Sequence, residues 1–212
     1  MESELRFYYS SNNYEKLNKK LKMYNDLNFE GCFYELTVQY DHPMKEKSFY
    51  SEEIDGRFRI RTSKEQNTGQ TKAKISWKRR NEQTFKGIVN NEEEVEMTFE
   101  YDELDKLIFL LENVIQMKKI ESYERYRNVF SNEDIEIVVD KYPFGIALEI
   151  ENKSKEKKPE DTILFWINRL KLNLDKAFRL SWDDKYTQLC KEQNVKNFKD
   201  VTFGLPMPKI LD

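Results

Sequence analysis

Residues that bind zinc or form disulfides are scarce in this chain. It has two cysteines, Cys32 and Cys190, far apart in the sequence, and a single histidine, His42. Their spacing matches neither a disulfide framework nor a zinc site built from several Cys and His ligands. So few cysteines fit a reducing compartment, and we therefore expect the protein to be cytoplasmic.

Long apolar segments and an excess of charge of one sign are missing as well. The first residues are acidic and polar, so we expect no signal peptide. The apolar runs are too short to cross a bilayer, so we expect no membrane partner. The 36 Lys and Arg residues against 39 Asp and Glu residues leave a formal net charge of −3. We therefore expect no non-specific binding of nucleic acid.

The chain does show a regular alternation of apolar and polar side chains. Charged residues make up 35% of its 212 residues, and aromatic residues make up 14%. The aromatic content is enough to build a core, which favours a folded chain over a disordered one. The length suits one sizeable domain. Because antiparallel strands dominate, the predicted class is α+β, with a single domain over residues 1–212. The predicted strands lie within residues 2–151, and residues 160–212 are predicted to form a C-terminal helical region. The predicted strands are 2–9, 32–40, 57–61, 72–80, 92–99, 123–130, 135–140 and 146–151, and the predicted helices are 14–23, 102–116, 162–172 and 182–193.

The first predicted strand carries charges on one face. Side chains alternate along a strand, so Glu2, Glu4 and Arg6 share a face. Two carboxylates and a guanidinium in this arrangement could hold a hard divalent cation beside an anionic ligand. Taken alone, the stretch is more typical of a solvated edge strand.

The charged faces of the later strands are sorted by sign. One interpretation is a wet outer sheet face with cross-strand salt bridges. The other is a sheet that curls into a barrel with its helices outside and its charges inside. Such an interior becomes reasonable if it holds a polyanion and metal ions. The acidic faces carry Glu2/Glu4, Glu92/Glu94/Glu96 and Glu149/Glu151, and the basic faces carry Arg57/Arg59/Arg61, Lys72/Lys74/Lys78 and Arg125/Arg127.

Seven short motifs occur in order along the chain. Together they resemble the CYTH superfamily, the triphosphate tunnel metalloenzymes, which include class IV adenylate cyclases and several triphosphatases. The resemblance implies an eight-stranded antiparallel β-barrel that forms a tunnel, with flanking helices. The motifs are Glu2-Ser3-Glu4-Leu5-Arg6, Tyr40-Asp41-His42-Pro43, Arg57-Phe58-Arg59-Ile60-Arg61, Ile75-Ser76-Trp77-Lys78, Glu94-Val95-Glu96, Arg125-Tyr126-Arg127 and Leu148-Glu149-Ile150-Glu151.

The resemblance also implies roles for individual residues. Catalysis would depend on Glu2, Glu4 and Arg6. The carboxylates would bind Mg²⁺ or Mn²⁺, and the cations would bind the triphosphate. The implied metal ligands are Glu2, Glu4, Glu149 and Glu151, with Glu94 and Glu96 as further candidates, and the implied triphosphate ligands are Arg6, Arg59, Arg61, Lys78, Arg125 and Arg127, with Lys74 as a further candidate.

Three functions stay open at this point. The first is a metal-dependent triphosphatase acting on ATP, thiamine triphosphate or tripolyphosphate. The second is an adenylate cyclase that converts ATP to cyclic AMP and pyrophosphate. The third is a non-catalytic binder of such ligands, because Arg6 and Arg125 stand where the family has lysine. Arginine keeps the charge but cannot transfer a proton in acid-base catalysis, because its guanidinium stays protonated. A homodimer also stays open.

Overall fold

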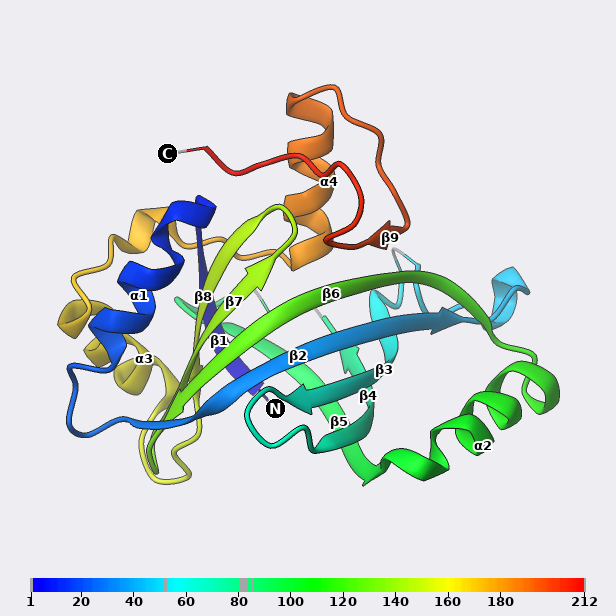
Figure 1. The fold of residues 1–212 in the computed structure, drawn as a ribbon, viewed down its shortest axis with the longest axis horizontal. Coiled ribbons are helices and arrows are strands. Elements are labelled where there is room, and N and C mark those ends of the chain that lie inside the picture. The colour runs from blue at the N-terminus through cyan, green and yellow to red at the C-terminus, as the bar shows by residue number, and fades with distance from the viewer. Residues whose placement is uncertain (1, 52, 81–83, 85, 212) are drawn as a thin grey trace.

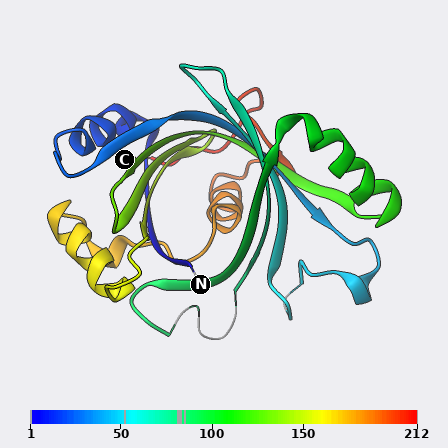
Figure 2. The same cartoon turned by 90° about the horizontal axis from the view of Figure 1, so that it is seen from below.

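An antiparallel barrel of eight strands is the centre of this computed structural model, which describes residues 2–51, 53–80, 84 and 86–211. The strand order is β2-β3-β4-β5-β1-β8-β7-β6, and pairing between β6 and β2 closes the ring (Figures 1 and 2). The predicted α+β class and eight-stranded barrel are thus confirmed. The strands are β1 (Glu2–Tyr9), β2 (Asn28–Asp41), β3 (Gly56–Glu65), β4 (Thr71–Arg79), β5 (Asn90–Glu100), β6 (Lys118–Ser131), β7 (Ile135–Tyr142) and β8 (Gly145–Asn152).

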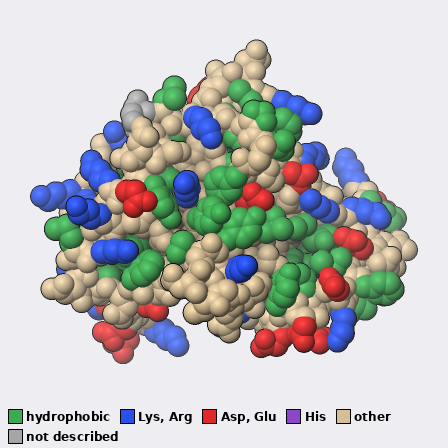
Figure 3. Space-filling model, viewed as in Figure 1, with side chains coloured by type: hydrophobic (Ala, Val, Ile, Leu, Met, Phe, Trp, Pro, Cys, Tyr) green, Lys and Arg blue, Asp and Glu red, His purple; other side chains and the backbone are tan. Residues whose placement is uncertain are grey.

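Alternation along the strands separates the two faces of the barrel wall. In β8, Leu148 and Ile150 point to the apolar outside, whereas Glu149 points inward and pairs with Arg6 of β1. Cross-strand register then brings opposite charges together, as where Lys78 of β4 lies opposite Glu94 of β5. The sorted charged faces therefore line the interior, as the barrel interpretation predicts. On the outer face seen in Figure 3, by contrast, charges of both signs are interspersed around apolar side chains.

Three helices cover the outside of the barrel (Figure 1). The helices α1 (Tyr14–Leu21) and α3 (Pro159–Arg169) bury the outer side of β1, β7 and β8, where Trp166 joins the main apolar cluster. The helix α2 (Leu104–Phe109) packs on a separate cluster that includes Tyr40. Burying these apolar faces supplies much of the driving force for folding.

The predicted helix over residues 102–116 is correct in extent but not in type. It begins as the 3₁₀-helix η3 (Tyr101–Glu103), continues as α2 and ends as the π-helix η4 (Leu110–Val114). The Ile115 N–H donates to the Leu110 carbonyl over 2.9 Å, five residues back. Apolar spacing over so few residues does not separate these helix types. The other short 3₁₀-helices are η1 (Ser11–Asn13), η2 (Lys45–Lys47) and η5 (Leu174–Lys176).

The helix α4 (Trp182–Glu192) lies across one end of the barrel instead of on its outer side. In Figure 2, which looks into the ring of strands, α4 is seen through its opening. A capping box formed by Ser181 and Asp184 starts the helix. Its apolar side packs on Tyr123, Tyr142 and the C-terminal tail, which adds the short strand β9 (Asp200–Val201) parallel to β6. Within the described chain, helices fall short of the length and apolarity that crossing a membrane requires.

Replacing Gly56 by alanine tests a close approach in the barrel wall. A Cβ at Gly56 would lie 2.1 Å from Cη2 of Trp77, and the Phe49 ring holds that indole in place at 5.0 Å between centroids. We expect Gly56→Ala to lower the free energy of unfolding by about 1–3 kcal/mol, measured by urea denaturation. Gly204→Ala is the matched control, because nothing lies within 4 Å of its Cβ position. Equal stability of the two variants would contradict the packing described.

Candidate active site in the barrel interior

Arg6 of β1 joins two interior carboxylates. Its Nε donates to Glu149 Oε1 over 2.7 Å, and its Nη2 donates to Glu4 Oε1 over 3.0 Å. Burial by itself raises the pKa of Glu149, but Arg6 and Arg127 outweigh it and hold that pKa well below its usual range. Glu4, Arg6 and Glu149, predicted from motifs far apart in the sequence, are therefore brought together.

Arg125 and Arg127 of β6 form a second cluster around two carboxylates that the motifs did not identify. Asp140 of β7 is fully buried and accepts from Arg125 Nη1 at 2.8 Å and from Arg127 Nε at 2.7 Å. Glu35 of β2 accepts from Arg125 Nε at 2.7 Å. Alternation did place both acids on the inward faces of their strands, with Asp140 on the same face as Glu136, but neither lies in one of the seven motifs, so the resemblance did not identify them.

Lys78 and Arg59 contact the acidic side of the interior. Lys78 is bonded to Glu2 and lies 2.7 Å from Glu92, and Arg59 Nη2 lies 3.3 Å from Glu94. Each predicted interior cation thus has a carboxylate partner. This pairing makes so many buried charges tolerable in the absence of a ligand.

Arg61 is the least neutralised of the predicted phosphate ligands. It donates to Thr37 Oγ1 at 3.0 Å and to the Tyr123 hydroxyl at 3.1 Å, while its ion-pair contact with Glu35 spans 3.7 Å. Burial alone raises the pKa of Tyr123, but Arg61 and Arg125 outweigh it and lower the pKa to about 8. The shift reports excess positive charge on this side of the interior.

Excess negative charge gathers around Glu2. Burial and the nearby Glu2 carboxylate raise the pKa of Glu94 to about 7. The same two causes raise the pKa of Glu151 to about 8, against the opposing effect of Lys153. Lys78, by contrast, holds the pKa of Glu2 itself well below its usual range against the effect of burial. Carboxylates crowded in this way attract protons or a cation.

The acidic group fits a hard divalent cation in charge and donor type. Glu2, Glu94 and Glu151 offer carboxylate oxygens, which Mg²⁺ and Mn²⁺ prefer. Nowhere in the described residues do three Asp, Glu, His or Cys side chains lie close enough to enclose a metal ion by themselves. A cation here would therefore take part of its coordination from water or from a ligand, as Mg²⁺ commonly does.

Lys74 and Glu96 lie at the rim of the interior. Their side chains are 34% and 48% exposed, and they pair with each other over 2.8 Å. The structure therefore does not place them with the buried residues.

Two buried polar groups of the interior find no hydrogen-bond partner among the described residues. They are the amide of Gln39, which is only 1% exposed, and the Nε of Arg59. Buried polar groups left this way are suited to a ligand or to water.

The two ends of the tunnel differ. At one end a cavity of about 300 Å³ lies among residues that include Arg61, Lys74 and Arg127, and it opens outward. At the other end α4 brings Asp183 against Arg57 and Asp184 against Arg80, at 3.4 and 3.1 Å. The free space left there beside Trp182 is about 30 Å³, the size of one water molecule.

The chain thus has the fold of a closed antiparallel β-barrel with a buried, charge-paired interior. Solved structures share this fold. The PH1819 protein of Pyrococcus horikoshii is 22% identical, with a TM-score of 0.63 over 91% of this chain and 99% of that one. HpAC1 of Hippeastrum, a proposed adenylyl cyclase with a dominant triphosphatase activity, is 16% identical, with a TM-score of 0.60 over 93% and 98%. A proposed adenylate cyclase of Vibrio parahaemolyticus is 17% identical, with a TM-score of 0.58 over 86% and 96%.

The sequence itself matches no family model and no curated protein. Similarity at these identities establishes the fold, the eight-stranded antiparallel barrel with flanking helices that the motifs predict.

Removing the charge of Asp140 tests the importance of the buried arginine cluster. Asp140→Asn leaves Arg125 and Arg127 short of one negative charge in a buried site. We expect the free energy of unfolding to fall by about 3–5 kcal/mol. Glu103→Gln, which breaks an exposed helical pair with Lys106, should cost less than about 1 kcal/mol. Similar losses for both variants would contradict a structural role for the interior pairing.

Stability should fall as the pH rises from about 5 to 8 in metal-free buffer. With raised pKa values, Glu94 and Glu151 keep protons in the folded chain that the unfolded chain has already released, so unfolding is favoured with rising pH. Glu151→Gln removes one of these groups. It should therefore be more stable than the wild type near pH 9 but not near pH 5, by urea denaturation, whereas the exposed Glu133→Gln should follow the wild type at both. A wild-type stability that rises over this interval would overturn the charge assignment.

Proposed function

We propose that this protein is a metal-dependent triphosphatase that binds a triphosphate-containing substrate in its tunnel. One observation carries the proposal: a group of arginines around Arg61 and a group of carboxylates around Glu2 line the same buried interior. A triphosphate with a divalent cation has the matching distribution, with anionic oxygens for the one side and a cation for the other.

The arginines supply binding and electrostatic stabilisation. Arg61, Arg125 and Arg127 present rigid guanidinium forks that suit phosphate oxygens. Because their present partners, Glu35 and Asp140, already hold them in place, little reorganisation is needed when phosphate arrives. Donors arranged in advance favour the charge that develops as a phosphoryl group transfers.

The carboxylates on the opposite side would hold Mg²⁺ or Mn²⁺. Glu2, Glu94 and Glu151 are the proposed first ligands, with Glu4 and Glu149 next to them. A bound cation would neutralise phosphate charge and make an attacking water more acidic. Lys78 bonds to Glu2, and Arg6 bonds to Glu4 and Glu149, so these cations orient three of the carboxylates.

The arginine at position 6 is compatible with catalysis. Arg6 spans Glu4 and Glu149, a role that requires positive charge and a fork-shaped donor but no proton transfer. This arrangement supports an enzyme over a binder without turnover. The triphosphatase activity of HpAC1, which has the same fold, supports hydrolysis ahead of cyclisation.

Product analysis distinguishes the candidate activities. We expect ATP with Mg²⁺ or Mn²⁺ to give ADP and phosphate, separated by ion-exchange chromatography. Cyclic AMP with pyrophosphate would instead establish a cyclase, and tight binding without products would establish a binder.

Substitutions at the two charged sides test the site itself. Glu4→Gln should lower kcat by on the order of 100-fold or more, because it removes a carboxylate beside the proposed metal site. Arg61→Ala and Glu149→Gln should weaken triphosphate binding by on the order of 10-fold in calorimetry. Glu103→Gln is the control and should match the wild type. An unchanged rate in Glu4→Gln together with unchanged affinity in the other two would refute the site.

A further inference from the structure

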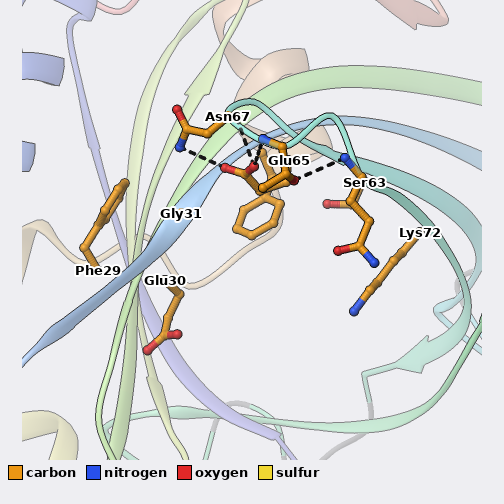
Figure 4. A pocket seen from close by; sticks show the side chains of 10 residues that line it. Phe29, Glu30, Gly31, Ser63, Glu65, Asn67 and Lys72 are labelled. Atoms are coloured by element: carbon orange, nitrogen blue, oxygen red, sulfur yellow. Dashed lines mark hydrogen bonds between the residues drawn. The ribbon is translucent and has the colours of Figure 1, made fainter.

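A pocket on the outer side of the barrel, beside α3, is separate from the tunnel. It has a volume of about 560 Å³, within the usual range of small-molecule sites, about 300–1,000 Å³. None of the residues that line it in the described chain lines the tunnel cavity. By contrast, the pocket of about 490 Å³ that Phe33 and Glu65 line shares Phe33 and Lys72 with that cavity, so it belongs to the proposed active site (Figure 4).

Four segments of the chain enclose the outer pocket, which we call the α3 pocket. They lie together on one side of the barrel (Figure 1). The helix α3 contributes Asp161, Thr162, Phe165 and Trp166, the α1–β2 loop contributes Asp26, the β6–β7 turn contributes Asn132 and Asp134, and the β8–α3 loop contributes residues 156–158.

Hydrogen bonds and an ion pair join the loops around the α3 pocket. The side chain of Asn132 donates to the Asp26 carbonyl over 2.9 Å, and its Oδ1 accepts from the Asp134 N–H at 2.9 Å. The Asp134 carboxylate pairs with Lys157, and the Asp134 carbonyl accepts from the Lys153 N–H at 2.9 Å. Because these contacts already hold the walls in place, a ligand would lose little free energy in ordering them.

One wall of the α3 pocket already holds a cation that belongs to the chain itself. The Arg169 guanidinium lies 4.5 Å from the ring centroid of Trp166 and 4.7 Å from that of Tyr24. It also donates to Asp26 Oδ1 over 2.8 Å. Aromatic faces beside a carboxylate attract cations, and flat guanidinium groups stack on them well. Phe165 extends this wall, and it is 58% exposed, so much of its ring is open to a ligand.

The lining of the α3 pocket keeps an excess of negative charge. Four carboxylates and two lysines line it. Two of the carboxylates form ion pairs, one with Lys157 and one with Arg169. The other two form no ion pair in the described part of the chain and are balanced only by Lys158, which leaves one negative charge in excess. The paired carboxylates are Asp134 and Asp26, and the unpaired ones are Glu156 and Asp161.

We propose that the α3 pocket binds a small organic cation with a planar body, such as an aryl amidinium or aryl guanidinium compound. Asp161 lies one helical turn before Phe165 on α3, so the unpaired carboxylate and the open ring share one face of the helix. The planar body lies against Phe165, and the charged group lies at Asp161. The unpaired carboxylates repel phosphate, so this site is distinct from the tunnel and does not depend on the proposed function.

Benzamidine is a suitable probe, because it joins a planar ring to a positive amidinium group, and benzamide is its uncharged counterpart of the same shape. We expect benzamidine to bind saturably in calorimetry and benzamide to bind about tenfold more weakly or less. Phe165→Ala and Asp161→Asn should each weaken the binding of benzamidine by about fivefold or more. Both replace exposed side chains, so the fold should be retained. Phe109→Ala and Asp105→Asn, which replace exposed residues of α2, are the matched controls and should bind as the wild type does.

Amide chemical shifts show where the probe binds, since the tunnel interior also contains carboxylates. We expect benzamidine to shift the resonances of α3 and of the β6–β7 turn and to leave those of β1 and β5 unchanged. Shifts confined to β1 and β5, equal affinity for benzamidine and benzamide, or unchanged binding in both Phe165→Ala and Asp161→Asn would each overturn the proposal. A lack of saturable binding up to about 10 mM benzamidine would overturn it as well.

Discussion

Ion pairing inside a closed barrel is the constraint on which the rest of this structure depends. Asp140, completely buried, accepts from both Arg125 and Arg127, and Glu35 shares Arg125 with it. An unpaired charge in such a place would be strongly unfavourable. Cross-strand register must therefore be maintained around the whole ring, because a slip of one residue would turn charged side chains toward the apolar outer layer.

The charges in the interior differ in sign between its two sides, and the two ends of the barrel differ in how far they are filled. Positive charge is in excess near Arg61, and negative charge is in excess near Glu2. At one end α4 adds Asp183 and Asp184, which engage Arg57 and Arg80, so those arginines are occupied from within the chain. A pocket of about 460 Å³ lies over these pairs, but its arginines already have carboxylate partners. At the opposite end, Arg61 and Arg127 line a cavity of about 300 Å³, and the proposed function follows from that asymmetry.

Much of the fold and part of the site could be predicted from the sequence. Alternation correctly separates Leu148 from Glu149, and the motifs correctly predict the eight-stranded barrel in which Arg6 meets Glu149 across 143 residues. Asp140 was missed because it lies outside the seven motifs, although it shares its strand face with Glu136. Lys74 and Glu96 follow the same alternation as their buried neighbours but lie at the rim, since depth along a strand depends on how far each strand extends in the assembled barrel.

The sequence by itself determined which side chains share a face, because that property depends only on the two-residue repeat of an extended backbone. It also determined the signs of those faces, and thus that any barrel built from them would have a charged interior. Only the tertiary structure decided which charges neutralise one another, that α4 closes one end, and that Phe33 and Glu65 meet at the other. Those relations join segments separated by tens to more than a hundred residues, and only the closure of the barrel and the packing of α4 against Tyr123 and Tyr142 bring them together.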